Sequence, residues 1–585
     1  MVPPFSLLTE AWIPVLRANG EADLIRPAAI TDGILDNPVV APAWGRADFD
    51  AATREFWIGL LAVACGARAK DAAWSAWFET PPKPAELDAA FAPLARAFVL
   101  DGDGPRFGQD AEDIAGEVVP VSQLLIEAPG ANTVKRNLDH FVRRGGVETL
   151  SRAGAAMALF TLQTYAPSGG AGHRVSVRGG GPLTTLLIPG SAEARKARAA
   201  QELRAAAVPL WSSLWLAVPS RTDGEPVPER VFPWLVPTRV SDKGQPTTSD
   251  QVDPLQAFWG LPRRIRLVVE ANPGGRPCDL TGRIDPLVVR SYRTRPHGTS
   301  YAGFTHPLSP HYRTKPGEPW LPLHGQPGRI GYRHWVGLVV DDEEGKTGRR
   351  PAAAVRKGID RLLDCDDPSV RLGTRLIAAG YDMDNMKARD FVESEMPLHL
   401  VGKAEFRPYD HTVRLMVRGA FEAEFILRVS LKQALAIEKG GLLDLGRGRF
   451  WERTEAGFGR TLEELSEALP GAGLMADTPH HPTLEQWLRQ LRKAATEVFK
   501  ELVPVEDLTD LRQSVAAERV KAEIGLDWAM RGYGKLGQAL FDALGLPRPE
   551  AKPKDAKPKD GKSKDGKSKD LKTETKAKKA KGGRT

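Results

Sequence analysis

A run of glycines is the feature whose residue types most directly suggest chemistry. Six glycines fall within residues 169–181, separated by small residues and by Arg174 and Arg178. Glycine-rich segments beside cations bind phosphates when they open a helix. Neither Gly-x4-Gly-Lys-Ser/Thr nor Gly-x-Gly-x-x-Gly is present, and Pro182 leads into a β-like run. The spacing therefore disfavours nucleotide binding, and a glycine turn between a helix and a strand is the simpler interpretation.

A second candidate is an acidic segment that resembles a calcium loop. Asp382 and Asp384 are spaced as the first ligands, and Glu393 follows eleven residues after the first. Met386 occupies the fifth position, however, and Lys387 stands where the loop requires glycine. A polar turn with solvated charges is the alternative, because no partner carboxylate for acid–base chemistry is evident.

Histidines and cysteines give no metal pattern. The histidines of one central segment lack His-x3-His spacing, and most lie beside prolines: His297, His306, His311, His324 and His334. Only three cysteines occur, far apart, and no Gly-x-Ser-x-Gly elbow is present. We therefore expect no cofactor, no metal and no enzymatic activity.

The elements that must position these residues predict a mixed fold. Helical periodicity covers residues 49–69 and 151–166, and β-like runs cover 181–190, 263–271 and 335–342. Proline- and glycine-rich loops separate them, and no regular doubly wound sheet or barrel emerges. Residues 1–400 are predicted to form one large, loop-rich α/β domain.

The C-terminal part is predicted to be helical. Apolar stripes at helical spacing mark residues 482–503 and 511–545, after shorter pieces at 427–439 and 461–469. Four helices with short connections predict an antiparallel bundle over residues 403–547. Residues 548–585 carry a repeated x-Lys-x-Lys-Asp pattern with almost no apolar side chain, which predicts a disordered tail.

Composition and charge limit the classes of protein. The 585 residues are 42% hydrophobic and 26% charged, as in soluble globular proteins. The net charge is +7, but residues 549–585 alone contribute +8, so the remaining chain is close to neutral. Binding to nucleic acid would therefore use local patches. No membrane segment or secretory signal is evident, and the few cysteines fit a reducing cytoplasm, where we expect the protein to reside.

Three polar loops with unusual backbone are candidates for recognition. The glycine run offers exposed amides, the proline-flanked loop at 306–320 offers Arg313 and Lys315, and residues 383–389 offer an amide, an apolar side chain and a cation. Bare backbone, a cationic finger and a wedge are what minor-groove proteins use on DNA. Glycines would let the backbone approach the narrow groove.

Six ordered motifs make the chain resemble a known family. They are FSLLTEAWIPVL, APGANTVKRNLDHFVRR, TYAPSGGAGHRVSVRGGGPLTTL, FWGLPRRIRL, HPLSPHYRTKPGE and GYDMDNMKARDFVESEMP. Together with the helical C-terminus, they resemble the CasA-type large subunit of the type I-E CRISPR surveillance complex Cascade over roughly residues 5–545.

This resemblance implies a function. The subunit is non-enzymatic, recognises a protospacer-adjacent motif (PAM) in double-stranded DNA through the minor groove, and starts unwinding and R-loop formation. Its implied partners are the backbone, small and handle-binding subunits, the 5′ handle of the guide RNA, the target DNA, and a helicase–nuclease recruited after R-loop formation. No membrane is involved.

The resemblance also assigns residues to roles. The glycine loop falls on Gly169, Gly170, Ala171 and Gly172, the lysine finger on Lys315 with Arg313 beside it, and the wedge on Asn385, Met386 and Lys387. The best-known members have glutamine at the wedge tip, so this chain departs from them there. Contacts to the guide handle or neighbouring subunit are implied for Asn132, Thr133 and Phe141.

The segment RPCDLTGR resembles one that carries several cysteines in some relatives, but it has only Cys278, so zinc is not expected. Two other classes stay open: a nucleotide- or metal-dependent enzyme, and a purely architectural ribonucleoprotein subunit.

Overall fold

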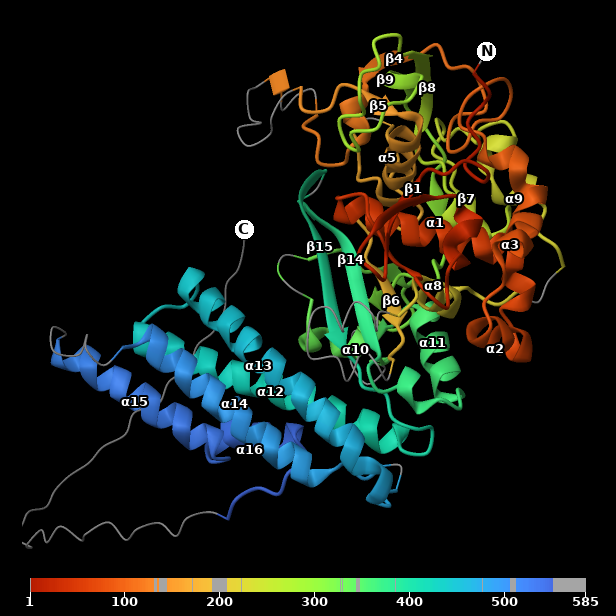
Figure 1. The fold of residues 1–585 in the computed structure, drawn as a ribbon. Coiled ribbons are helices and arrows are strands. Elements are labelled where there is room, and N and C mark those ends of the chain that lie inside the picture. Colours follow the sequence, from red (N-terminus) through yellow and green to blue (C-terminus); the bar gives the residue numbers. More distant parts are fainter. Residues whose placement is uncertain are drawn as a thin grey trace, which may run out of the picture.

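The protein consists of a mixed α/β part followed by a group of long helices. The computed structural model describes residues 2–130, 134–135, 145–170, 172–191, 208–221, 224–326, 328, 330–342, 348–384, 386–475, 477–504 and 512–550. Figure 1 shows the α/β part, coloured red to green, beside the helices, coloured cyan to blue. This arrangement confirms the predicted fold class of an α/β part and a helical C-terminal part. The boundaries of the predicted domains stay a prediction.

Helix α1 forms the centre of the α/β part. It spans Ala47–Cys65, and most of its residues are buried, including Phe56, Trp57 and Leu60. Helix α5 packs against it, as the apolar pattern at 151–166 predicts. The other helices of this part are α2 (Asp71–Glu79), α3 (Pro84–Phe91), α5 (Arg152–Tyr165), α8 (Leu210–Ala217), α9 (Pro228–Val231), α10 (Trp335–Leu338) and α11 (Ala353–Leu363).

Small sheets surround these helices. Their strand orders are β2-β1-β3, β10-β7, β12-β11-β13, β15-β14-β6, and β4-β9-β5 with β8 on β9. The strands are β1 (Ile13–Arg17), β2 (Ala22–Ile25), β3 (Val39–Pro42), β4 (Glu117–Pro120), β5 (Leu150–Ser151), β6 (Thr184–Ile188), β7 (Thr247–Thr248), β8 (Arg264–Ala271), β9 (Leu287–Arg295), β10 (Tyr301–Ala302), β11 (His311–Arg313), β12 (Leu321–Pro322), β13 (Gly348–Arg350), β14 (Arg375–Asp384) and β15 (Lys387–Pro397).

The long β14–β15 hairpin differs from the sequence prediction. The acidic segment around Asp382 suggests only a polar turn, yet β14 and β15 pair along their whole length. Strand β6 pairs with Arg375–Ala379 alone, so the distal half of the hairpin continues beyond the sheet. Figure 1 shows this ribbon extending well past β6.

Residues 335–342 form no strand of the kind that their apolar pattern predicts. Trp335–Leu338 make a helical turn, and Gly337 turns the chain with φ +101°. Trp335 is buried against Phe458 of the helical part, which explains the apolar pattern without a strand. The prediction of a strand at 335–342 is wrong.

The C-terminal helices pack around the longest of them. Helix α12 contacts each of the four that follow it among the described residues. They are α12 (Phe406–Leu435), α13 (Gly441–Ala468), α14 (His481–Leu502), α15 (Gln513–Met530) and α16 (Gly534–Ala543). The helical pattern at 511–545 is interrupted at Gly532, where φ is +91° and the chain turns from α15 into α16.

The two parts share a continuous apolar core. The Tyr332 ring stacks on Phe458 at 4.3 Å between centroids, and its hydroxyl lies 2.7 Å from the hydroxyl of Thr454. Arg414 of α12 donates a 2.6 Å hydrogen bond to the carbonyl of Asp341. Among the described residues, no helix is long and apolar enough to cross a membrane.

Candidate nucleic-acid interface

The glycine run connects α5 to β6 and is tied to α1 by Arg178. This arginine is 2% exposed and donates a 2.7 Å hydrogen bond to Glu55 of α1. Its other donors reach the hydroxyls of Thr184 and Ser309, at 2.9 and 3.3 Å. Arg178 is therefore an internal anchor, and it is not available to a ligand at the surface.

The anchor is fully hydrogen-bonded around Glu55. Tyr165 and Thr184 donate to the same carboxylate oxygen at 2.6 and 2.5 Å. Burial and the nearby Glu55 carboxylate raise the pKa of Tyr165 well above its usual value, so its hydroxyl stays protonated and donates. Satisfied polar networks of this kind fix one arrangement of the groups around them.

The other arginine of the run is held by the backbone nearby. Arg174 donates to the hydroxyl of Ser241 at 2.8 Å and to its carbonyl at 2.7 Å. The Ser241 hydroxyl in turn donates to the carbonyl of Gly298 at 2.6 Å. Neither arginine of the glycine run is thus a free cation.

Most glycines of the run are required by the packing of the chain itself. A side chain at Gly169 would overlap Arg263, and one at Gly172 would come within 2.7 Å of Pro296. The later glycines behave alike, since a Cβ at Gly181 would lie 2.5 Å from Met383. Gly170 differs: it is exposed, has φ +85°, and faces open space. Of the described loop glycines at 169, 170 and 172, only Gly170 has open space on the side where a Cβ would stand.

The two cations at the start of the loop between β11 and β12, Arg313 and Lys315, have different surroundings. Arg313 lies 4.7 Å from the centre of the Trp320 ring, which Arg350 also contacts at 4.4 Å. Lys315 is exposed and makes no ion pair within the part of the chain that the structure describes. Lys315 is therefore the freer cation of the pair.

The tip of the β14–β15 hairpin carries an exposed apolar side chain. Met386 is 53% exposed, and Lys387 beside it is exposed as well. Below the tip, Arg389 and Asp382 form a 2.6 Å ion pair across the strands, next to a bulge at Asp382/Met383. Met386 and Lys387 thus stand at the end of a two-stranded ribbon.

The roots of all three segments lie side by side. The amide of Leu183 donates to the carbonyl of Leu323 at 2.8 Å, and Pro182 bridges His324. Gly325 in turn forms a parallel bridge with Asp382 of β14. The glycine run, the loop at 306–320 with Lys315 (the lysine loop) and the β14–β15 hairpin are far apart in sequence. They nevertheless start from neighbouring positions in the structure, which we call their common base.

Helix α1 anchors two of these three segments. Asp48 accepts a 2.6 Å hydrogen bond from the hydroxyl of Tyr381 in β14, and Glu55 holds Arg178. The two acids are seven residues apart, which places them on one face of the helix. Sequence reasoning missed both. The available signal was a pair of acids at helical spacing in an otherwise apolar helix.

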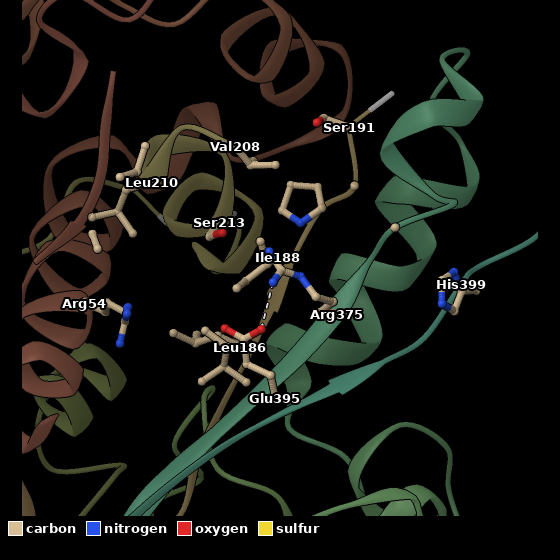
Figure 2. A pocket seen from close by; sticks show the side chains of 16 residues that line it. Arg54, Leu186, Ile188, Ser191, Val208, Leu210, Ser213, Arg375, Glu395 and His399 are labelled. Atoms are coloured by element: carbon tan, nitrogen blue, oxygen red, sulfur yellow. Dashed lines mark hydrogen bonds and ion pairs between the residues drawn. The ribbon is translucent and has the colours of Figure 1, made fainter. Parts of the chain in front are cut away.

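A cavity of about 450 Å³ lies beside β6, β14 and α8. Figure 2 shows Arg375 of β14 and Glu395 of β15 paired with each other in its lining, and their atoms are 2.8 Å apart. Because this pair is mutually neutralised and most of the other lining groups are apolar, the cavity offers packing space rather than a reaction centre. Its lining includes Arg54, Leu186, Ile188, Ser191, Leu210, Ser213 and His399.

Of the five central histidines, His306 and His311 are buried, and the other three are partly buried. Burial lowers the pKa of His306 well below its usual value and that of His311 to about 4. Within the described ranges, no group of three His, Cys, Asp or Glu residues is arranged to hold a metal ion. Five site residues lie outside the described residues: Asn132, Thr133, Phe141, Ala171 and Asn385. The tail from residue 551 onward also lies outside them.

Comparison with known proteins decides the family. Residues 6–498 match the family of the CRISPR-associated protein Cse1 (CRISPR_cse1). The chain belongs to the Cse1 family. This match confirms the resemblance to CasA-type proteins, since one similar structure is named CasA (Cse1). No curated protein matches the chain in sequence.

Solved structures of Cse1 proteins share the fold. CasA (Cse1) of Thermus thermophilus is 18% identical with a TM-score of 0.64, and the alignment covers 90% of this chain and 99% of that one. Cse1 of Thermobifida fusca is 17% identical with a TM-score of 0.65, covering 93% and 98%. A chain of a CRISPR RNA-guided surveillance complex is 16% identical with a TM-score of 0.62, covering 90% and 100%.

Proposed function

We propose that this chain is the non-catalytic subunit of a type I-E CRISPR complex that recognises a PAM in double-stranded DNA. Its family membership and its likeness to a chain of an RNA-guided surveillance complex support a place in such a complex. The observation that carries the proposal is the common base of three segments, which end in Gly170, Lys315 and Met386.

The chemistry of these three ends suits the minor groove. Gly170 offers backbone without a side chain, Lys315 offers a charge toward groove acceptors and phosphates, and Met386 offers an apolar group that can enter a base step. Minor-groove patterns are degenerate, so recognition of the PAM is relaxed rather than restricted to one sequence.

Met386 and Asn385 take the place of the glutamine at the wedge tip. Insertion of one of these side chains between two base pairs starts the unwinding of the duplex. Exchange of the DNA duplex for a guide–target heteroduplex is nearly balanced in free energy, so the protein needs only to open the first steps. The guide RNA then reads the sequence. After R-loop formation the chain helps to recruit the helicase–nuclease, and the segment with Asn132, Thr133 and Phe141 contacts the guide handle or the neighbouring subunit.

The test is a gel-shift titration of the assembled complex on duplexes with and without a PAM. Gly170→Asp places a carboxylate where the backbone meets DNA, and we expect it to abolish PAM-dependent binding while assembly is retained. Gly104→Asp is the matched control, because Gly104 is also exposed, has φ +97° and faces open space. Equal binding of wild type and Gly170→Asp would refute the role of the loop. Assembly without any PAM preference in the wild type would favour a purely architectural subunit.

A further inference from the structure

Arg263 is a buried cation whose counter-charge is missing from the described part of the chain. It is 8% exposed, and its Nη2 donates to the carbonyl of Pro167. Its Nε and Nη1 make no hydrogen bond to any described residue. Burial lowers the pKa of Arg263 to about 10, so the guanidinium is still charged at neutral pH. A buried charge without a partner costs free energy, which a ligand of opposite charge would offset.

Most other buried arginines among the described residues have a carboxylate or several carbonyls as partners. Arg152 pairs with Asp285, Arg178 with Glu55 and Arg264 with Asp110. Arg361 has no carboxylate partner, but its guanidinium donates to the carbonyls of Leu216, Val218 and Ala69 at 2.8, 3.0 and 2.5 Å. Arg266 has no hydrogen-bond partner at Nε, but it donates to the carbonyl of Asp110 at 3.0 Å and lies 3.9 Å from the carboxylate of Asp113. Arg263 differs from all of these in having one hydrogen bond and no carboxylate among the described residues.

The unpaired edge of Arg263 lies directly beneath the glycine loop. Its Nη1 occupies the space that a side chain at Gly169 would need, and Gly169 itself is exposed. The glycine at this position therefore lets a buried guanidinium reach the backbone at the surface.

The glycine loop adds further hydrogen-bond donors that have no partner, as Nε of Arg263 has none. Within the described chain, the amide N–H groups of Gly170 and Gly172 donate no hydrogen bond. Both residues have left-handed backbone, with φ of +85° and +79°. Unpaired backbone N–H groups in turns are donors that can bind an anion.

The histidines beside the loop contribute no negative charge. His173 precedes Arg174, and His297 contacts Gly172. Burial, and then the charge of Arg263, lower the pKa of His173. The one carboxylate that acts on this surrounding is Glu117, which raises the pKa of His173 against the effects of burial and of Arg263, and no described carboxylate lies within 4 Å of Arg263.

We propose that Arg263, with the amides of Gly170 and Gly172, binds one phosphodiester of the duplex DNA. The phosphate is the counter-ion that the buried guanidinium lacks, and Arg is suited to phosphate through its charge and its forked donors. This assignment rests on the proposed function, because it places DNA at the glycine loop. A phosphate contact fixes the position of the protein on the duplex and carries no sequence information itself.

The first test compares Arg263→Gln with wild type in the assembled complex, over a range of KCl concentrations. We expect binding about tenfold weaker on duplexes with and without a PAM, so the preference for the PAM is unchanged. The slope of log K against log salt should fall in magnitude by about 0.9, the value for one lost phosphate contact. Arg361→Gln is the matched control, a buried arginine substituted identically that should leave both affinity and slope unchanged.

The second test leaves the protein intact and neutralises single phosphates of the duplex as methylphosphonates. One position should weaken wild-type binding about tenfold and should not weaken Arg263→Gln further. This coupling would be absent if Arg263 only supported the fold. An unchanged salt slope in Arg263→Gln, or equal losses for both proteins at every phosphate, would overturn the proposal.

The outcomes also separate this site from the proposed function. If the wild type showed no PAM preference, the proposed function would fail whatever Arg263 does. If Arg263→Gln released the guide RNA while duplex affinity stayed unchanged, the phosphate would belong to RNA and the assignment to DNA would be wrong.

Discussion

The buried pair of Glu55 and Arg178 gives the strongest stability prediction. Their side chains are 1% and 2% exposed, so removing one leaves the other as an uncompensated charge. Breaking a buried pair from one side costs about 3–5 kcal/mol. We expect Glu55→Gln and Arg178→Met each to lower the free energy of unfolding by about that amount. In Glu55→Gln the amide oxygen can still accept from the hydroxyl of Tyr165, but the amide nitrogen then faces Nη2 of Arg178, donor against donor, which adds to the loss of charge.

The double variant should cost little more than either single variant. Once both charges are absent, neither desolvation penalty remains, so the coupling energy is about 3 kcal/mol. Urea unfolding of the full-length chain, followed by tryptophan fluorescence, measures all three variants. The exposed pair of Arg276 and Glu148, at 44% and 55% exposure, is the control, and Arg276→Met should cost no more than about 1 kcal/mol. Strictly additive losses from Glu55→Gln and Arg178→Met would refute the reasoning.

Two further predictions concern the lysine loop and acid stability. Lys315→Ala should weaken PAM-dependent binding by about 1–3 kcal/mol and leave the melting temperature unchanged, whereas Arg313→Ala, which loses its contact with Trp320, should mainly lower stability. The reverse pattern, seen by gel shift and thermal melting, would contradict the assignment of Lys315 as the finger. His311 has a pKa of about 4 in the folded protein, because burial disfavours its charged form, and a usual value of 6.5 when unfolded. The unfolded state therefore binds more protons between these values, and the free energy of unfolding should fall by roughly 3 kcal/mol as pH drops from 6.5 to 4. His311→Gln should remove that part of the pH dependence, and an unaltered profile would show that His311 is not its source.

Elements with a clear apolar period could be predicted from the sequence. Helices α1 and α5 and strands β6 and β8 bury one face or more, so their residue types follow the period of the element. The hairpin β14–β15 escaped prediction because its distal half extends beyond β6 and charges such as Asp384 and Asp390 interrupt its apolar residues. Residues 335–342 show the opposite error. Their apolar pattern predicts a strand, but Trp335 packs on Phe458 of a helix instead.

The candidate site could be predicted only in part for a related reason. Residue types and family resemblance indicate which loops are unusual, as at Gly170 and Lys315. They do not show which polar groups face inward. The partner of Arg178 is Glu55, which precedes it by 123 residues, and a local pattern carries no information about a contact so distant. The same holds for Arg263, whose proposed role depends on the absence of a carboxylate partner among the described residues.

Under the proposed function, the anchoring of two of the three segments on α1 has a consequence for engineering PAM preference. Asp48 and Glu55 hold the segments at Tyr381 and Arg178, behind the exposed ends. The exposed ends can therefore be exchanged separately from the contacts that hold the segments on α1. The loop ends of a relative that recognises another PAM could be transplanted while Asp48 and Glu55 and their partners are kept. In natural relatives we expect the sequence to change rapidly at the exposed loop ends and slowly along the face of helix α1 that carries Asp48 and Glu55.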